Sequence, residues 1–261
     1  MRGRALLLVV VAASAARATE LHPVDEDLGG PASRYADALR DLALRGEAPA
    51  ASEPGASIVG LTCVATPGDG KYVGIVQRME IAAPLGEVEA ILADVAHYKD
   101  LFPGLVDVHE VPGSRDGNRY VTAWEQRVPI FFIPNTRFEL TYLVSRVVEG
   151  RIVYRYRLAL SRDVTNSDGI IVLEATAPGL TRFTEYDFFN ARWGLLPESA
   201  VWRESVRGSV ASDLAIKLKA EHPTLSYRRI AAEAERLRRA VDGDVERCLK
   251  RRTPSWVAPA R

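Results

Sequence analysis

The chain has 261 residues, of which 47% are hydrophobic and 26% are charged. That length and balance are typical of a soluble globular protein with a sizeable core, and they exclude a disordered tail and a bundle of membrane helices. The formal net charge is zero, from 34 basic and 34 acidic residues, which argues against a strongly basic nucleic-acid binder.

Residues 1–18 have the pattern of a secretory signal peptide. Arg2 and Arg4 precede an apolar run over residues 5–13, and Ala16-Arg17-Ala18 has the small-x-small form that signal peptidase cleaves. The run is about half of the roughly 20 residues that span a bilayer, so an uncleaved anchor is the weaker alternative. We therefore expect export to a periplasmic or extracellular compartment.

The charges are unevenly distributed along the remaining chain. Residues 19–223 contain 21 basic and 29 acidic residues, whereas residues 224–261 contain 10 basic and 5 acidic residues. An acidic body therefore carries a basic tail. The aromatic residues of the body have no basic groove around them, so we expect no nucleic-acid partner.

The chain has two cysteines, Cys63 and Cys248. In an oxidising compartment they could form a disulfide across a very long loop, which chain entropy makes worth roughly 4 to 5 kcal/mol. The alternative is two unrelated thiols, one in a strand and one on a helix. Neither cysteine lies in a CxxC or Cys/His cluster, so the sequence predicts no metal site and no cofactor.

The sequence divides into four parts: the signal peptide (1–18), an N-terminal helix and linker (19–57), a main domain (58–221) and a basic C-terminal helix and tail (222–261). Within the second part, periodicity predicts a helix over residues 31–46, and a segment rich in Pro, Ala and Ser follows it. The C-terminal helix, over residues 224–252, is amphipathic. We expect its apolar stripe to pack on the main domain, with binding to anionic lipid as the alternative.

The main domain consists of strand-like runs rich in Val, Ile, Thr and Tyr, separated by turn signals such as Glu149-Gly150 and Pro178-Gly179. Strands are predicted over residues 58–65, 72–81, 106–111, 119–128, 137–148, 151–161, 169–177 and 181–190. Helices are predicted over residues 85–102 and 199–221. Short loops join antiparallel strands, and the alternation predicts one sheet face in water and one covered by the second helix.

Two segments, residues 79–88 (MEIAAPLGEV) and 92–103 (LADVAHYKDLFP), give the domain a family resemblance. Together with the order strand, helix, meander and long helix, they resemble the START-like helix-grip superfamily of StAR-related lipid-transfer, polyketide cyclase/dehydrase and coenzyme Q-binding proteins. The resemblance implies an α+β fold with a curled antiparallel sheet of about seven strands around a long C-terminal helix, and extra helices at both ends. It also implies a hydrophobic cavity between sheet and helix.

Large aromatic side chains at inward strand positions are the candidate ligand-binding residues, because a ring supplies an apolar wall and its polar tip can orient a ligand. The alternative is that they only fill the core. The set is Tyr120, Trp124, Tyr142, Tyr154, Tyr156, Tyr186 and Phe188, with Trp202 on the covering helix.

The strand over residues 181–190 has an ambiguous register, because both of its alternating sets contain aromatic residues. We prefer the set of Tyr186 and Phe188 as the inward one, because the other set would bury Glu185 and Asp187.

Residues 128–135 form an unusual loop, with four consecutive large apolar residues between two prolines. Phe131 and Phe132 are candidates for a ligand gate or a contact with a membrane surface. The alternative is that this loop is buried over the mouth of the sheet.

The sequence predicts no catalytic residue, since His97 and His109 have ordinary surface contexts and no nucleophile–base pair or Gly-x-Ser-x-Gly elbow occurs. We expect an exported protein that binds or carries a hydrophobic small molecule, such as a lipid, sterol-like or quinone-like compound. A cyclase or aromatase-type enzyme and an envelope interaction scaffold without ligand are the alternatives. Nothing in the sequence sets the oligomeric state.

Overall fold

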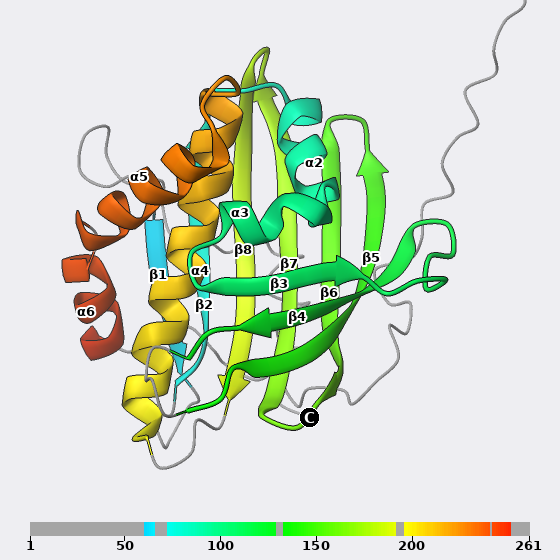
Figure 1. Cartoon of the computed structure of the whole chain (residues 1–261). Coiled ribbons are helices and arrows are strands. Elements are labelled where there is room, and N and C mark those ends of the chain that lie inside the picture. Colours follow the sequence, from blue (N-terminus) through cyan, green and yellow to red (C-terminus); the bar gives the residue numbers. More distant parts are fainter. Residues whose placement is uncertain (1–59, 66–71, 129–132, 192–195, 241, 252–261) are drawn as a thin grey trace, which may run out of the picture.

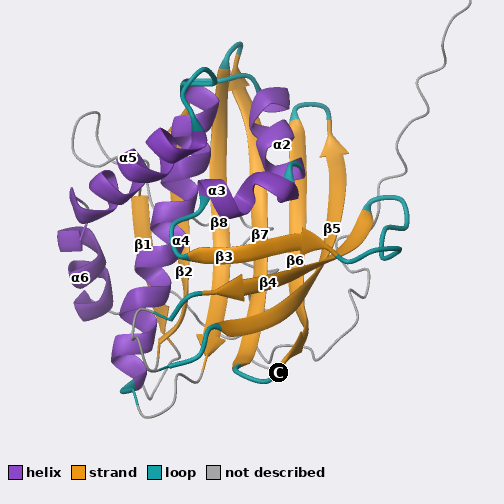
Figure 2. Ribbon diagram, in the orientation of Figure 1, coloured by secondary structure: helices purple, strands orange, loops and turns teal. Residues whose placement is uncertain are grey.

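The structure, a computed structural model, describes residues 60–65, 72–128, 133–191, 196–240 and 242–251. It contains an antiparallel sheet that curls, so that β3 and β4 cross in front of the longer central strands (Figure 1). Helices α2, α4 and α5 lie on the same side of this sheet (Figure 2). The elements are β1 (Gly60–Ala65), β2 (Tyr72–Ile81), α2 (Leu85–Ala93), η1 (Val95–His97), α3 (Tyr98–Leu101), β3 (Leu105–Glu110), β4 (Arg119–Gln126), β5 (Thr136–Val148), β6 (Arg151–Ser161), β7 (Val164–Ala177), β8 (Leu180–Ala191), α4 (Glu198–Glu221), α5 (Tyr227–Ala240) and α6 (Asp242–Arg251).

The described residues form one eight-stranded sheet in the order β1-β2-β8-β7-β6-β5-β4-β3. After β2 the chain passes through α2 and α3 to the opposite edge, and the strands from β3 to β8 then return as a meander until β8 pairs with β2. The 24-residue helix α4 covers the concave side. The predicted α+β architecture, a curled antiparallel sheet with a long C-terminal helix, is confirmed.

Two of the predicted helices are broken in the structure. The helix expected over residues 85–102 ends at Asp94, whose backbone leaves the helical region and whose carboxylate lies 2.6 Å from Nδ1 of His97. A short 3₁₀ turn and α3 follow before Pro103. The helix expected over residues 224–252 is two helices, α5 and α6. Periodicity could not locate these breaks, because the apolar spacing continues across both of them.

The strand predicted over residues 169–177 begins earlier than expected, because the turn-like residues Asn166, Ser167 and Asp168 lie inside β7. Asn166, Asp168 and Gly169 each have a role in the packing of the sheet. The side-chain amide of Asn166 donates to the carbonyl of Phe188, and Asp168 accepts from Arg157 at 3.0 Å. Gly169 lies under the ring of Tyr156. The turn is at residues 162–163 instead, while the predicted turns at Gly150 and Gly179 are present, each with a positive φ that favours glycine.

The prediction of one wet sheet face is also wrong at the centre of the sheet. Paired residues on neighbouring strands share a face, and one row runs through Leu143, Arg155, Ile170, Tyr186 and Val76. Four of these five side chains are buried, and Arg155 is partly buried. Alternation in β6 suggested water on this side because three arginines occupy it, but the neighbouring strands contribute apolar residues.

Cys63 of β1 and Cys248 of α6 form a disulfide, with their Cα atoms 5.2 Å apart. The bridge joins the edge strand to a helix that is 185 residues away in sequence, so it fixes the C-terminal helices to the sheet. The apolar side of α5 also packs into the core through Ile230 and Ala234, which are fully buried. This arrangement agrees with the expected packing of the C-terminal amphipathic segment on the domain.

Several predictions lie outside the described residues: the signal peptide, the N-terminal helix and linker, and the loop residues Phe131 and Phe132. Within the described ranges, no helix combines the length and apolar character required to cross a membrane.

Candidate ligand cavity

A cavity of about 160 Å³ lies between the concave side of the sheet and helix α4. Strands β4 to β8 supply one wall, α4 supplies the opposite wall, and the segment from α2 to β3 closes one end. An apolar cavity of roughly this volume accepts a benzene-sized guest. The space therefore fits a single ring or a short chain in the conformation seen.

One end of the cavity is aromatic. Trp124 and Phe138, paired across β4 and β5, stack with their ring centroids 6.0 Å apart, and Phe189 of β8 lies 6.1 Å from Phe138. Tyr142 and Tyr98 complete this group, which we call the aromatic wall: Tyr98, Trp124, Phe138, Tyr142 and Phe189. Rings at these separations attract one another beyond their burial of apolar area.

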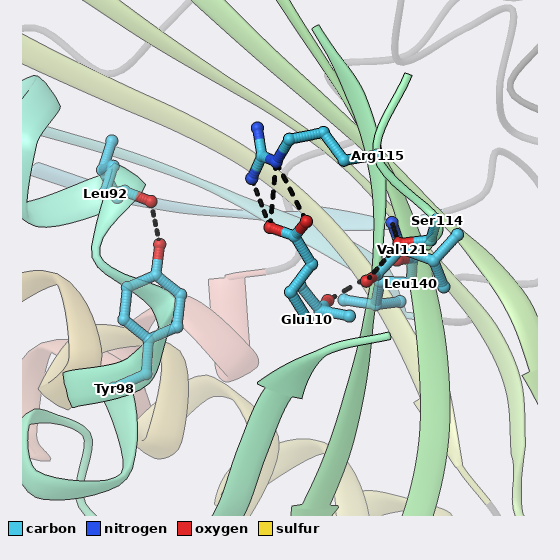
Figure 3. Close-up of polar contacts among 8 residues, drawn as sticks. Leu92, Tyr98, Glu110, Ser114, Arg115, Val121 and Leu140 are labelled. Carbon is cyan, nitrogen blue, oxygen red and sulfur yellow. Dashed lines mark hydrogen bonds and ion pairs between the residues drawn. The ribbon is translucent and has the colours of Figure 1, made fainter. Parts of the chain in front are cut away.

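Hydrogen bonds hold the rim of the aromatic wall in place. Figure 3 shows the hydroxyl of Tyr98 donating to the carbonyl of Leu92, which ties α3 to the end of α2. Burial raises the pKa of Tyr98 well above its usual value, so this hydroxyl stays a donor. Figure 3 also shows Arg115 paired with Glu110. The guanidinium of Arg115 lies 4.3 Å from the ring centre of Tyr120.

The other end of the cavity carries three carboxyl groups, Glu185 and Asp187 on β8 and Asp213 on α4, which we call the acid cluster. Tyr156 reaches this cluster from β6, although β7 lies between β6 and β8. Tyr156, Gly169 and Asp187 are paired in one row across β6, β7 and β8. The ring of Tyr156 passes over Gly169, where a Cβ would lie 1.9 Å from its Cζ. The missing side chain at Gly169 leaves room for the phenol ring to cross β7.

Glu185 is the centre of the hydrogen bonds in the acid cluster. Its Oε1 lies 3.2 Å from the hydroxyl of Tyr156, which also lies 3.1 Å from Oδ1 of Asp187. Its Oε2 accepts from the hydroxyl of Ser209 and from the side-chain amide of Gln77, each at 3.2 Å. The Gln77 amide also donates to Ser209 Oγ at 2.6 Å, so β2, β6, β8 and α4 all meet at this carboxyl group.

Burial raises the pKa of all three carboxyl groups. For Asp187, the loss of water and then the negative charge of Glu185 raise the pKa to about 8. Burial raises the pKa of Asp213 well above its usual value, and Glu185 adds to the shift as a neighbouring charge and as a hydrogen-bond partner. Hydrogen bonds to Glu185, the largest from Asp213, partly offset the rise in its own pKa. The cluster therefore retains protons near neutral pH, and Asp213 shares one with Glu185.

No lysine, arginine or histidine is among the described residues that line the cavity. Oδ2 of Asp213 is buried, and no described residue donates a hydrogen bond to it. In the part of the chain that the structure describes, no group of His, Cys, Asp and Glu side chains is arranged to hold a metal ion. The acid cluster is thus a desolvated set of acceptors with no cationic side chain among the described residues of the lining.

The structure places the predicted ligand-binding residues in three different positions. Trp124, Tyr142, Tyr154 and Tyr156 line the cavity. Tyr120 is buried and stacks on Tyr142 behind the wall, and Trp202 is buried on α4 away from the lining.

The register predicted for β8 is wrong. Tyr186 pairs with Val76 on the opposite sheet face, and the ring of Phe188 lies against Gly74, where a Cβ would be 2.5 Å from its Cδ1. Glu185, Asp187 and Phe189 line the cavity instead. Sequence reasoning rejected this register because of the cost of burying two carboxyl groups. Those groups are buried next to donors from other elements and keep protons, which lowers that cost.

Sequence reasoning also missed the cavity side of α4. Ser205, Gly208, Ser209, Ser212 and Asp213 line the cavity, whereas the predicted apolar residues of this helix are buried beside them. A row of small polar residues at helical spacing was the available signal, because large side chains on that side would fill the cavity.

No protein-family model matches the chain, and no curated protein matches it. Among solved structures, human STARD10 is 15% identical, with a TM-score of 0.52 over 90% of this chain and 92% of that one. The lipid transfer and protein localization domain of human StarD13 is 13% identical, with a TM-score of 0.50 over 75% of this chain and all of that one. The Zhui aromatase/cyclase from a Streptomyces species is 21% identical over 59% of this chain and 96% of that one, with a TM-score of 0.49. At these identities the likeness shows the fold alone: the chain has the START-like helix-grip fold.

Proposed function

From the START-like helix-grip fold, we propose that this protein binds a hydrophobic small molecule in the cavity between the sheet and α4. The observation that carries the proposal is the cavity itself, because interiors are normally packed without spaces larger than a water molecule. Aromatic rings line one end of it and polar groups converge at the other, which is the usual composition of a small-molecule site.

The volume of about 160 Å³ limits the size of the part of a ligand that the cavity can enclose. Sites for drug-sized molecules typically measure roughly 300 to 1,000 Å³. A compound built around one ring therefore fits as the cavity stands, whereas a lipid with two acyl chains or a sterol would require the cavity to enlarge. The human StarD13 domain is named for lipid transfer, and for this chain we propose a smaller guest.

Binding is tested with a graded series of neutral alkylbenzenes, from benzene to butylbenzene, added to the full chain while its unfolding temperature is followed. We expect the smaller members to raise this temperature, because a ligand that binds only the folded state stabilises it. Native mass spectrometry of gently purified protein tests for a retained ligand. Absence of both a retained mass and any thermal shift would contradict the proposal.

A matched pair of variants at Gly208 locates the binding. Gly208 lines the cavity from α4, and among the described residues a Cβ there would come within 4 Å only of Gln126 Nε2, at 3.8 Å. Gly208→Leu places a branched side chain in the space, and we expect it to weaken alkylbenzene binding by about tenfold or more. Gly208→Ala adds one methyl group and should change affinity by less than about threefold. Equal affinities in the two variants would place the ligand elsewhere.

A second candidate function, an enzyme of the cyclase or aromatase type, is favoured by the acid cluster. An acid–base catalyst works best with a pKa near the working pH, and that of Asp187 is raised to about 8. Cyclisation by aldol condensation would need a base to remove a proton from carbon and an acid to release water. Asp187 and Tyr156 are adjacent donors and acceptors of the required kind.

Product masses distinguish an enzyme from a carrier. A poly-β-ketone thioester incubated with the wild type should yield a product lighter by one water if the protein is a cyclase, and Asp187→Asn should abolish that product. An unchanged mass in both proteins would contradict catalysis and leave the carrier function standing.

We also propose that the protein is exported, with residues 1–18 removed. The disulfide between Cys63 and Cys248 supports this proposal, because such bridges persist mainly outside the cytoplasm. Intact-mass measurement on protein from cell envelopes should find a chain that begins at Thr19. An unprocessed chain with two free thiols would contradict export.

A further inference from the structure

The acid cluster gives the cavity a group of carboxyl oxygens that can accept a positive charge. Three carboxyl groups converge on one end, and the described residues that line the cavity include no cationic side chain. Buried carboxylates are normally paired with a cation or neutralised by protons. Protons fill that role in the acid cluster, and a bound cation can take their place.

The cluster also contains an acceptor that lacks a donor. Asp213 is 3% exposed and lines the cavity, and its Oδ2 is a buried atom for which the described residues supply no hydrogen bond. This oxygen accepts whether or not Asp213 carries its shared proton. A ligand that only accepts hydrogen bonds, such as a quinone carbonyl, leaves it unpaired. The complementary ligand must therefore bring a donor.

We propose that the acid cluster is the polar subsite of the cavity and binds the protonated amine of a small aromatic or alicyclic amine, whose ring lies against the aromatic wall. The inference rests on the proposed binding function and names its ligand class. An ammonium group has three donors, enough for Asp213 Oδ2 and two further oxygens of the cluster.

The surroundings of the cluster suit a cation with an attached ring. Tyr156 and Tyr142, with ring centroids 5.5 Å apart, connect the acid cluster to the aromatic wall. The negative faces of such rings attract an ammonium group, and the attraction is stronger where water is excluded. The cavity volume of about 160 Å³ sets the limit at one ring with a short amine-bearing chain.

Isothermal titration calorimetry of the full chain with 2-phenylethylamine and 2-phenylethanol tests the inference. The two probes have the same size and differ in charge. We expect the amine to bind about tenfold or more tightly than the alcohol at pH 7. Titrations in two buffers of different ionisation enthalpy should show proton release, because the ammonium displaces a proton from the cluster.

Asp213→Asn should reduce the preference for the amine to less than about threefold, because it removes a charge while retaining the shape of the side chain. Asp187→Asn is a second variant with the same expectation, which preserves the test if one variant fails to fold. Asp163→Asn is the matched control, since Asp163 is exposed outside the cavity and the same change there should leave the preference intact.

Equal affinities for the two probes would overturn the inference, and so would a preference for the amine that survives both cluster variants. Either result would leave the hydrophobic binding function standing. Failure of both probes, together with failure of the alkylbenzene series, would instead contradict the binding function itself.

Discussion

The two ends of the cavity differ in how the chain builds them. The aromatic wall comes mainly from β4 and β5, neighbouring strands in which Trp124 and Phe138 alternate with outward residues. The acid cluster joins β8 to α4 and depends on Tyr156 from β6 and Gln77 from β2. The first end therefore follows from local alternation, and the second requires contacts among four elements that are distant in sequence. The two ends should therefore also differ in what they contribute to the free energy of unfolding and in how that contribution depends on pH.

The largest expected effect is at the aromatic wall. Phe138 is 7% exposed and packs between Trp124 and Phe189. Phe138→Ala should lower the free energy of unfolding by about 3 to 5 kcal/mol. No charge is involved, so denaturant titrations at pH 4 and pH 8 should give the same loss. Leu160→Ala is the control, because Leu160 is 62% exposed and should cost almost nothing.

The next largest effect is expected beneath the acid cluster. Gly169→Ala places a methyl group where the ring of Tyr156 lies, 1.9 Å from Cζ. Overpacking of this kind costs roughly 1 to 3 kcal/mol, and the forced shift of Tyr156 should move its hydroxyl away from Asp187. Thermal unfolding measures the cost, and the amine preference should fall with it. A variant as stable as the wild type would show that the ring can move freely.

The pH dependence of stability should distinguish the acid cluster from the aromatic wall. The folded pKa of Asp187 is raised to about 8 by burial and by Glu185, and Asp168 of β7 adds negative charge. Because Asp213 on α4 is raised as well, the protonated cluster stabilises the fold fully below about pH 4. That contribution is lost as pH rises towards 8.

Asp213→Asn should reduce the loss of stability at high pH, since it deletes one of the coupled charges. We expect no advantage over the wild type at pH 4 and a higher free energy of unfolding than the wild type at pH 8, because the asparagine has no proton to lose in the buried cluster. Denaturant titrations of both proteins across this range measure the difference. A constant difference between the two would contradict a protonated cluster.

The smallest expected effect is a gain at Gly208, on the α4 side of the cavity. The methyl group of Gly208→Ala meets no atom of the described residues closer than 3.8 Å, and the change replaces a glycine within a helix. Helix propensity predicts a gain of up to about 1 kcal/mol. A loss of stability in Gly169→Ala and a gain in Gly208→Ala would confirm that Tyr156 fills the space on the sheet side and that the space on the helix side is open.

The sequence predicted the order of the elements with few errors. Turn residues such as Gly150 and Gly179 marked the hairpins, and period-two alternation in β4 to β6 identified Trp124, Tyr142 and Tyr156 as inward residues. These signals are local: they depend on the backbone preferences of a few residues and on one sheet face packing against α4. For the same reason, Trp124 and Tyr142 of the aromatic wall were predictable, whereas Phe189 belongs to the β8 face that was assigned to water.

The acid cluster was not predictable, because its stability depends on groups that the chain brings together only when it folds. Considered alone, β8 should turn Glu185 and Asp187 towards water, since burial of a carboxylate is costly. The structure supplies what the strand lacks: the gap at Gly169, the hydroxyls of Tyr156 and Ser209, and a proton shared with Asp213. The sequence by itself determined the sheet, the long helix and the inward positions of Trp124 and Tyr142, through local periodicity. Only the tertiary structure decided which face of β8 lines the cavity, because that choice depends on distant donors, on protonation and on the absence of one side chain.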